Sequence, residues 1–166
     1  MKSNFIKFVY GVGYQISSEL IRILKTKNLG VKIVILSKDG NRILLVEHSY
    51  KRTPMWYLPG GAVHTKERPD EAIRREIFEE LGLNILVPDL VGIYKGRRES
   101  DDLTFLFATI LETNELNNHS TLSEIDNIVL FKRNELPSKL SPGVNERIGD
   151  VFKFRKNKQK LIWGTW

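Results

Sequence analysis

The spacing of hydrophobic residues changes about 30 residues into the chain. Up to residue 28, apolar residues recur every three or four positions, which predicts a helix, most strongly over residues 14–27. From Val31 onward β-branched residues dominate, and the apolar runs 31–36 and 42–46 flank an Asp-Gly turn, which is typical of a β-hairpin. The pattern therefore predicts an N-terminal helical segment followed by a sheet.

Two further helices and three further strands are predicted along the rest of the chain. Pro69 stands in the first turn of a predicted helix over residues 69–81, and Gly82 comes directly after its end. A last helix starts near Ser141-Pro142 and continues to about Lys156. The three strands are predicted at residues 90–94, 103–111 and 128–131. This mixture of strands and helices indicates an α/β protein.

The composition is typical of one globular domain. The chain has 166 residues, of which 41% are hydrophobic, and this length is sufficient for a self-supporting core. It contains no cysteine, which excludes a disulfide framework and thiolate metal sites and is compatible with a cytoplasmic location. No apolar run reaches the ~18 residues that would be needed to span a bilayer.

Charge is distributed unevenly along the chain. Residues 1–38 hold 7 basic and 1 acidic residue, residues 132–166 hold 9 and 3, and residues 39–131 hold 10 and 16. The ends are therefore basic although the centre is acidic. A cluster of carboxylates must be explained by a cation, by a role in proton transfer or by solvation.

The predicted helix over residues 69–81 carries part of this acidic centre. At about 100° per residue, Glu76, Glu79 and Glu80 fall within one arc of roughly 100°, beside an apolar stripe. Like charges at these spacings destabilise an isolated helix. A solvated acidic face is the plain interpretation, and a cation-binding face is the alternative.

A longer motif around this helix favours the second interpretation. The chain has Gly61, five residues, Glu67, seven residues, Arg75-Glu76-Ile77, one residue, Glu79-Glu80, one residue and Gly82-Leu83. This run resembles the Nudix box, G-x5-E-x7-R-E-U-x-E-E-x-G-U with U aliphatic, at every specified position. The preceding Trp56–Gly61 also resembles the usual lead-in, and the flanking strands extend the resemblance to about residues 31–137. The chain is similar to Nudix hydrolases.

This resemblance implies a fold and a reaction class. The fold would be a Nudix-type α/β/α sandwich around a mixed β-sheet. The family motif does not explain the N-terminal segment, and the apolar spacing adds an extra N-terminal helix there. The expected organisation is a basic amphipathic helical segment over residues 1–29, the Nudix domain with its C-terminal helix over residues 30–157, and a tail over residues 158–166. The reaction would be divalent-metal-dependent hydrolysis of the pyrophosphate linkage in a nucleoside diphosphate linked to another moiety.

The resemblance also implies roles for individual residues. Carboxylates suit Mg²⁺ (or Mn²⁺), and bound metal neutralises pyrophosphate and activates water. Arg75 would orient the carboxylates, and Glu67 would support the loop or an outer metal shell. The metal ligands would be Glu76, Glu79 and Glu80, assisted by the Gly60 carbonyl.

A further carboxylate is often supplied from a loop beyond the box in this family. Glu124 fits that place best, seven residues before Phe131. Glu112, Glu115 and Asp126 are rivals, and an ordinary loop glutamate is the plain alternative.

Several residues are candidates for substrate binding, each with a structural alternative. His64 stands where many relatives have glutamate, and it either contacts phosphate or is a solvated loop residue. Aromatic rings can stack on a base, although aromatic residues in strands more often belong to the core. The loop arginines can reach over a substrate or lie in a solvated hairpin tip. These further candidates are Trp56, Tyr57, Phe131, Arg97 and Arg98.

The sequence does not identify the substrate, and other functions compete with a small-nucleotide pyrophosphohydrolase. The basic ends favour an enzyme acting on the 5′-triphosphate end of RNA, and a non-catalytic nucleotide-binding module on the same fold is a third hypothesis. Residues 1–28 would dock on the domain or on a second subunit in a homodimer, or would lie on an anionic membrane. Docking is the favoured hypothesis, because Gly11 and Gly13 interrupt the apolar stripe.

Overall fold

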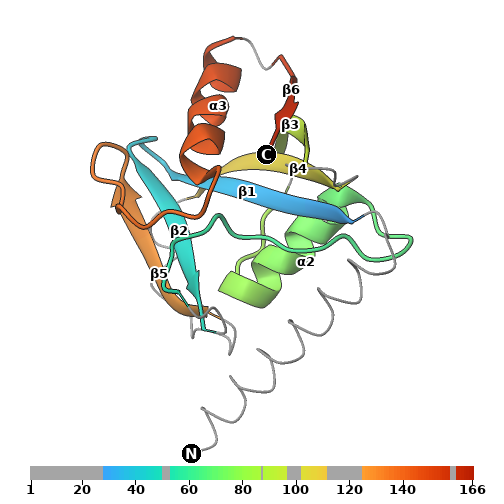
Figure 1. The fold of residues 1–166 in the computed structure, drawn as a ribbon, viewed down its shortest axis with the longest axis horizontal. Coiled ribbons are helices and arrows are strands. Elements are labelled where there is room, and N and C mark those ends of the chain that lie inside the picture. The colour runs from blue at the N-terminus through green and yellow to red at the C-terminus, as the bar shows by residue number, and fades with distance from the viewer. Residues whose placement is uncertain (1–27, 50–52, 87, 97–101, 112–124, 158–159) are drawn as a thin grey trace, which may run out of the picture.

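The computed structural model describes residues 28–49, 53–86, 88–96, 102–111, 125–157 and 160–166. In these residues a mixed six-stranded sheet lies between two helices, one on each face (Figure 1). The predicted α/β/α sandwich is therefore confirmed. The expected N-terminal helix lies outside the described residues and stays a prediction.

The described elements in chain order are β1 (Leu29–Ser37), β2 (Arg42–His48), α2 (Pro69–Leu81), β3 (Asp89–Lys95), β4 (Leu103–Leu111), β5 (Ile125–Lys132), α3 (Val144–Lys156) and β6 (Ile162–Thr165). The strands lie in the sheet in the order β5-β2-β1-β4-β3-β6. The neighbouring strands β1 and β4 are parallel, as are β3 and β6, whereas the other neighbours are antiparallel.

Strand β1 shows why the sheet needs a cover on both faces. Successive side chains of a strand point to opposite faces. Val31, Ile33 and Ile35 pack in one hydrophobic cluster with α2, whereas Val34 and Leu36 pack in a second cluster with α3. All five side chains are fully buried. The continuous apolar run in the sequence is thus explained by a central strand whose two faces are each covered by a helix.

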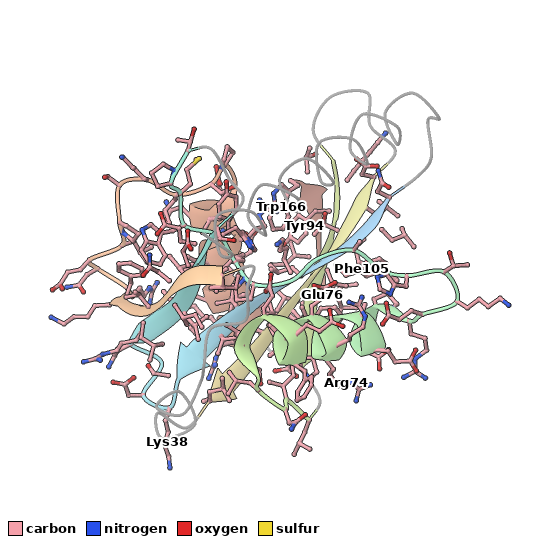
Figure 2. All side chains as sticks on the ribbon, turned by 90° about the horizontal axis from the view of Figure 1, so that it is seen from below. Lys38, Arg74, Glu76, Tyr94, Phe105 and Trp166 are labelled. Carbon is pink, nitrogen blue, oxygen red and sulfur yellow. The ribbon has the colours of Figure 1, made fainter. Side chains whose placement is uncertain are left out.

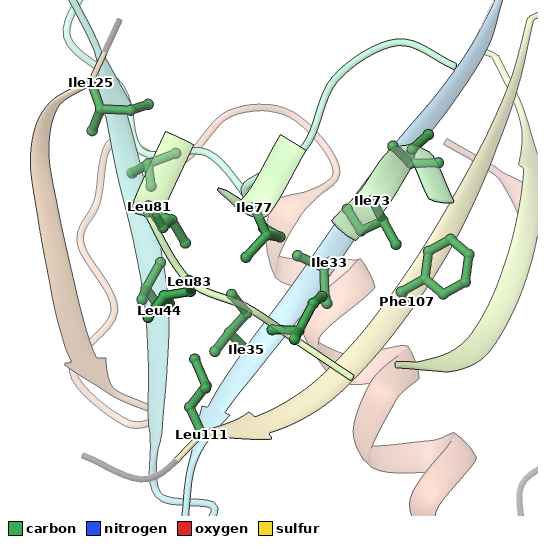
Figure 3. Packing of buried hydrophobic residues seen from close by; sticks show 14 residues of the cluster. Ile33, Ile35, Leu44, Ile73, Ile77, Leu81, Leu83, Phe107, Leu111 and Ile125 are labelled. Atoms are coloured by element: carbon green, nitrogen blue, oxygen red, sulfur yellow. The ribbon is translucent and has the colours of Figure 1, made fainter. Parts of the chain in front are cut away.

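Helix α2 begins and ends where the sequence predicts. The side chain of Glu71 accepts the backbone N–H of Arg68 at 3.0 Å, and Gly82 ends the helix in the left-handed conformation with φ 66°. Ile73, Ile77 and Leu81 face the sheet and are fully or almost fully buried (Figure 3). Burying each such side chain contributes about 1.5–3 kcal/mol to folding stability. The apolar stripe therefore holds one face of α2 against the sheet, and the glutamates lie on the helix beside that face.

The end of the chain differs from the sequence-based expectation. Residues 162–165 form β6, an edge strand that pairs in parallel with β3, and the Trp166 N–H donates to the Lys95 carbonyl at 2.8 Å. The sequence does not predict this strand, because four residues that include a glycine carry no clear alternation. Within the described ranges, neither helix has the length and apolar character needed to cross a membrane.

Candidate active site

The loop before α2 runs alongside the first half of β1. The Val31 N–H donates to the Gly61 carbonyl at 2.9 Å, and the Ile33 N–H donates to the Pro59 carbonyl at 3.1 Å. Gly60 has φ +119°, and a Cβ on it would lie 2.3 Å from the Val31 carbonyl oxygen. A side chain at position 60 is therefore excluded by both backbone conformation and space.

Two glutamates of α2 hold this loop from the other side. The Gly60 N–H donates to Glu80 Oε2 at 2.8 Å, and Glu80 is buried, with 7% of its surface exposed. The carboxylate of Glu76 lies against Gly61 so closely that a Cβ on Gly61 would be 2.5 Å from Glu76 Oε2. The helix and the loop are thus joined through carboxylates rather than through apolar contacts alone.

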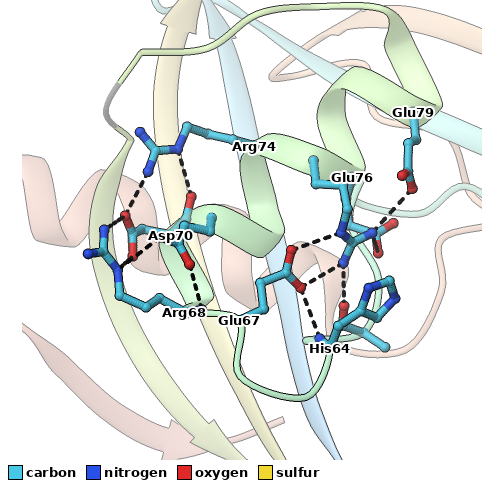
Figure 4. A network of polar contacts seen from close by, with 10 residues as sticks. His64, Glu67, Arg68, Asp70, Arg74, Glu76 and Glu79 are labelled. Atoms are coloured by element: carbon cyan, nitrogen blue, oxygen red, sulfur yellow. Dashed lines mark hydrogen bonds and ion pairs between the residues drawn. The ribbon is translucent and has the colours of Figure 1, made fainter.

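Arg75 connects the loop and three acidic side chains, Glu67, Glu76 and Glu79, which are labelled in Figure 4. Its Nε and Nη2 donate to the two carboxylate oxygens of Glu67 at 2.9 and 3.0 Å. Its Nη1 donates to Glu76 at 2.8 Å and to Glu79 at 3.2 Å, and Nη2 also donates to the Ala62 carbonyl at 2.9 Å. All five N–H donors of the guanidinium group are used, which a lysine cannot reproduce.

Glu67 is positioned by this pairing. The hydrogen bonds from Arg75, together with one from the backbone N–H of His64 at 2.9 Å, lower the pKa of Glu67 to about 2. Both of its carboxylate oxygens therefore have donors on the protein. These contacts join Glu67 to Arg75 and to the loop, and both of its expected roles, in stabilising the loop and in an outer metal shell, stay predictions.

The donor set suits a hard divalent cation. Glu76 and Glu79 flank the positive charge of Arg75, and the Glu79 side chain is 58% exposed, so cations in solution can reach it. Oxygen ligands of this kind are those that Mg²⁺ and Mn²⁺ prefer. Across the described residues, no three His, Asp or Glu side chains are grouped closely enough to hold a metal ion. Protein donors orient each carboxylate instead: Arg75 for Glu76 and Glu79, and the Gly60 N–H for Glu80.

Lys32 is a site residue that no pattern in the sequence indicates. Its ammonium group donates to the Leu58 carbonyl at 3.1 Å and also to the Gly60 carbonyl, the oxygen that the family resemblance offers to the metal. A lysine in a β-branched strand gives no signal of this role, because its contact depends on a loop 26 residues later in the chain. Its charge stabilises two backbone oxygens at the edge of the site.

A small pocket opens beside the same loop, between the sheet and the start of α3. Its volume is about 150 Å³, and its wall includes Lys32, Leu58, Gly61, Thr104, Ser141 and Trp166. Trp166 was not expected to be a site residue, because it lies more than 80 residues beyond the motif. The pocket is smaller than the ~300–1,000 Å³ of a cleft for a drug-sized molecule, so it has room for one part of a ligand.

The structure places two predicted aromatic substrate contacts within packed surroundings. The Trp56 ring lies edge-on to Phe131, with ring centroids 4.7 Å apart, and belongs to the cluster beside α3. The Tyr57 ring lies 5.2 Å from the His48 ring on the α2 side, although Tyr57 also lines the pocket. Their contacts are those of core residues, and substrate binding by either ring stays a prediction.

The remaining candidates are exposed or lie outside the described residues. His64 is exposed at the loop, and Asp126 is exposed on β5. The structure does not describe Glu124, its rivals Glu112 and Glu115, or the arginines Arg97 and Arg98, so their roles stay predictions.

Comparison with known proteins shows the family of this chain. The family model for the NUDIX domain matches residues 26–151. The chain belongs to the Nudix family. Members of this family generally use divalent metals such as Mg²⁺ or Mn²⁺. The Nudix match stops before β6 and Trp166, which therefore add to the pocket from outside the matched region.

Relatives of this Nudix chain carry different names. It is 38% identical over 77 residues to a putative 8-oxo-dGTP diphosphatase of Bacillus subtilis, a match that covers 46% of this chain and 50% of the relative. It is 31% identical over 80 residues to the mouse diphosphoinositol polyphosphate phosphohydrolase 3-alpha, which covers 48% and 47%. The matched part of the chain thus spans about half the length of these relatives.

The fold itself is found in solved structures. The MutT protein from Methanosarcina mazei Go1 superimposes with a TM-score of 0.63 at 22% identity, covering 81% of this chain and 96% of that one. Such a match shows that the two chains share the Nudix fold.

Proposed function

We propose that this protein hydrolyses the pyrophosphate linkage of a small nucleotide, a nucleoside diphosphate linked to another moiety, with the help of a divalent metal. The observation that carries this proposal is the joining of α2 to the loop by Glu76 and Glu80, with Glu79 exposed beside them. A solvated acidic face would not bury Glu80 or press Glu76 against a glycine. The names of the two relatives, a diphosphatase and a phosphohydrolase, support the reaction class and differ in substrate.

Glu76, Glu79, Glu80 and the Gly60 carbonyl would hold the metal, for which the three carboxylates would have to lie closer together than they do beside their present protein donors. A bound Mg²⁺ or Mn²⁺ neutralises pyrophosphate oxygens and lowers the pKa of a bound water. Arg75 fixes Glu76 and Glu79 in their orientations through Nη1, and Glu67 fixes Arg75. Because positioning and electrostatics supply most of the rate in phosphoryl transfer, this network would be important although it touches no phosphate.

The bond changes follow from hydrolysis. The oxygen of one water bonds to a phosphorus, the bridging P–O bond on that phosphorus breaks, and two phosphate-terminated products leave. A carboxylate would take the proton of the attacking water, and Glu124 is the proposed residue for this step. Lys32, which lines the pocket beside the loop, would place a positive charge near the substrate phosphates.

A substrate panel tests this function. Nucleoside triphosphates, nucleotide sugars and dinucleoside polyphosphates are incubated with Mg²⁺ or Mn²⁺, and the products are identified by mass. We expect at least one nucleotide to be cleaved at its pyrophosphate linkage. We also expect EDTA to abolish cleavage without unfolding the protein, because strand pairing and two apolar clusters hold the sheet and its core together. Turnover that persists after complete chelation, or the absence of cleavage across the panel, would contradict the proposal.

A further inference from the structure

We propose that Trp166 is a specificity-determining residue whose indole packs against a planar ring of the substrate. This inference rests on the proposed function and deepens it, because it names the kind of substrate: one with a flat ring next to its phosphates. It assigns a role to the part of the chain that lies beyond the family match, which ends at residue 151.

The pocket and the acidic site share one loop residue. Gly61 lines the pocket that Trp166 also lines, and the carboxylate of Glu76 lies directly against the same glycine. A group bound in the pocket is therefore separated from the carboxylates by little more than the thickness of the backbone. A substrate that extends around this loop from the carboxylates would place its attached group within reach of Trp166.

Trp166 is held in place by a stack of side chains. The guanidinium carbon of Arg147 lies 4.0 Å from the centroid of the Tyr94 ring and 5.6 Å from that of Trp166. The two rings also meet edge to face, with centroids 6.0 Å apart, and Figure 2 shows them close together. Arg147 is buried, with 7% of its surface exposed, and it forms an ion pair with Asp150 at 3.4 Å. Such cation–π contacts strengthen when they are shielded from water.

Glycines provide the flat surfaces that this stack needs. A Cβ on Gly143 would lie 3.2 Å from Nε1 of Trp166, and a Cβ on Gly164 would lie 3.1 Å from the Tyr94 ring. On Gly92 a Cβ would lie 2.7 Å from the Tyr94 hydroxyl. A Cβ would therefore displace the Tyr94 hydroxyl at Gly92 and would crowd the two rings at Gly143 and Gly164, so the backbone packs closely around a preorganised Trp166 wall of the pocket.

The chemistry of the wall selects a flat and largely uncharged ring. Of the described residues that line the pocket, Lys32 alone carries a charge, and it lies at the Gly60 edge, beside the proposed metal site. An inositol ring that bears several phosphates would need several cations in the pocket. A nucleobase or a similar ring can instead stack on the indole face, and the ammonium group of Lys32 can bind the adjoining phosphate.

Binding of product-like ligands tests this inference without depending on turnover. AMP, GMP, CMP and UMP, with inorganic phosphate as the probe that lacks a ring, are titrated calorimetrically into wild type and Trp166→Leu in the presence of Mg²⁺. We expect wild type to bind at least one nucleoside monophosphate about tenfold more tightly than phosphate, in line with the size of base–aromatic stacking. Trp166→Leu should lose most of that advantage and keep its affinity for phosphate.

Three further measurements separate stacking from folding. Trp166→Phe retains a flat ring and should retain most of the affinity, and Phe78→Leu, at an exposed aromatic residue on α2, should bind as wild type does. In wild type, the indole N–H resonance of Trp166, assigned by its loss in Trp166→Phe, should shift with the monophosphate and not with phosphate. The inference is wrong if Trp166→Leu binds within twofold of wild type, if that resonance does not move, or if no monophosphate binds better than phosphate. If the protein hydrolyses no nucleotide of the panel, the proposed function is wrong, whereas these binding measurements still decide whether Trp166 contacts a ring of the ligand.

Discussion

The carboxylate of Glu76 lies against the α-carbon of Gly61, with no room for a Cβ between them. A methyl group at that position would be 2.5 Å from Glu76 Oε2 and 2.6 Å from Oε1. Gly61 does not have a positive φ, so the requirement for glycine is one of space and not of backbone strain. The Nudix box thus begins with a residue whose lack of a side chain positions a glutamate 15 residues later.

Gly61→Ala should displace the Glu76 carboxylate and lower activity. Changes at residues that orient metal ligands typically cost about 10–100-fold in activity or metal affinity, and we expect a loss in that range in kcat/KM. Gly149→Ala is the matched control, because a Cβ there meets nothing within 4 Å inside α3. It should leave kcat/KM unchanged and raise the melting temperature slightly. Equal activity of the two variants would show that the close contact with Glu76 is unimportant.

Arg75→Lys should lower activity although it keeps the charge. A lysine has three N–H donors and no planar fork, so it cannot serve Glu67, Glu76, Glu79 and the Ala62 carbonyl together. We expect about a 10–100-fold loss in kcat/KM, measured with Mg²⁺ at saturation, and a weaker affinity for Mn²⁺. Arg68→Lys, at an exposed site on the same loop, serves as the control. Wild-type kinetics in Arg75→Lys would mean that charge alone suffices.

Lys32→Met tests whether the Gly60 carbonyl belongs to the metal site. Removing the ammonium group deprives the Leu58 and Gly60 carbonyls of a charged donor, and hydrogen bonds to charged groups contribute about 1.5–3 kcal/mol. The variant should therefore melt at a lower temperature than wild type when EDTA is present. Mg²⁺ should raise its melting temperature more than that of wild type, because the metal then no longer competes with the ammonium group for the Gly60 carbonyl.

The exposed Lys139 supplies the control for this experiment, as Lys139→Met. It should show the wild-type response to both EDTA and Mg²⁺. If Mg²⁺ shifts the melting temperatures of Lys32→Met and wild type by the same amount, the Gly60 carbonyl is not a ligand.

Tyr94 should make stability fall at alkaline pH. Burial, followed by the neighbouring Asp150 carboxylate, raises the pKa of Tyr94 above its usual value of 10. Above pH 10 the unfolded chain loses this proton and the folded protein keeps it, so folding becomes less favourable by about 1 kcal/mol per pH unit. Below pH 10 the group is neutral in both states and has no such effect. The free energy of unfolding, measured by urea at pH 8 to 11, should fall more steeply for wild type than for Tyr94→Phe. Parallel curves would contradict the assignment.

The elements of the fold could largely be predicted from the sequence, because their signals are local. The limits of α2 follow from Pro69 and Gly82, and the first hairpin follows from an Asp-Gly turn between β-branched runs. Helix α3 begins at Val144 and not at Ser141-Pro142, since Gly143 has φ +88°. Strand β6 depends on pairing with β3, a contact about 70 residues away in the chain that no local pattern shows.

The residues of the candidate site also divide into those that a local pattern predicts and those that depend on tertiary packing. Glu76, Glu79, Glu80 and Arg75 were found because the motif places them on one helix at fixed spacing. Lys32 and Trp166 were missed because each reaches the site through tertiary packing, one from a central strand and one from beyond the last strand. Trp56 and Tyr57 were predicted from residue type, yet their rings pack against Phe131 and His48, which sequence cannot distinguish from a substrate contact.

The most direct test of metal-dependent hydrolysis by the α2 carboxylates is the turnover of Glu79→Gln on the nucleotide that the panel identifies, with Mg²⁺ at saturation. Glu79 is 58% exposed, so the change should leave the melting temperature within about 2 °C of wild type. Glu71→Gln, at an exposed position in the first turn of the same helix, is the control, because glutamine also serves there as a capping residue. We predict that kcat falls about a hundredfold or more in Glu79→Gln and is unchanged in Glu71→Gln. A folded Glu79→Gln variant with the wild-type kcat would show that these carboxylates form a surface face and not an active site.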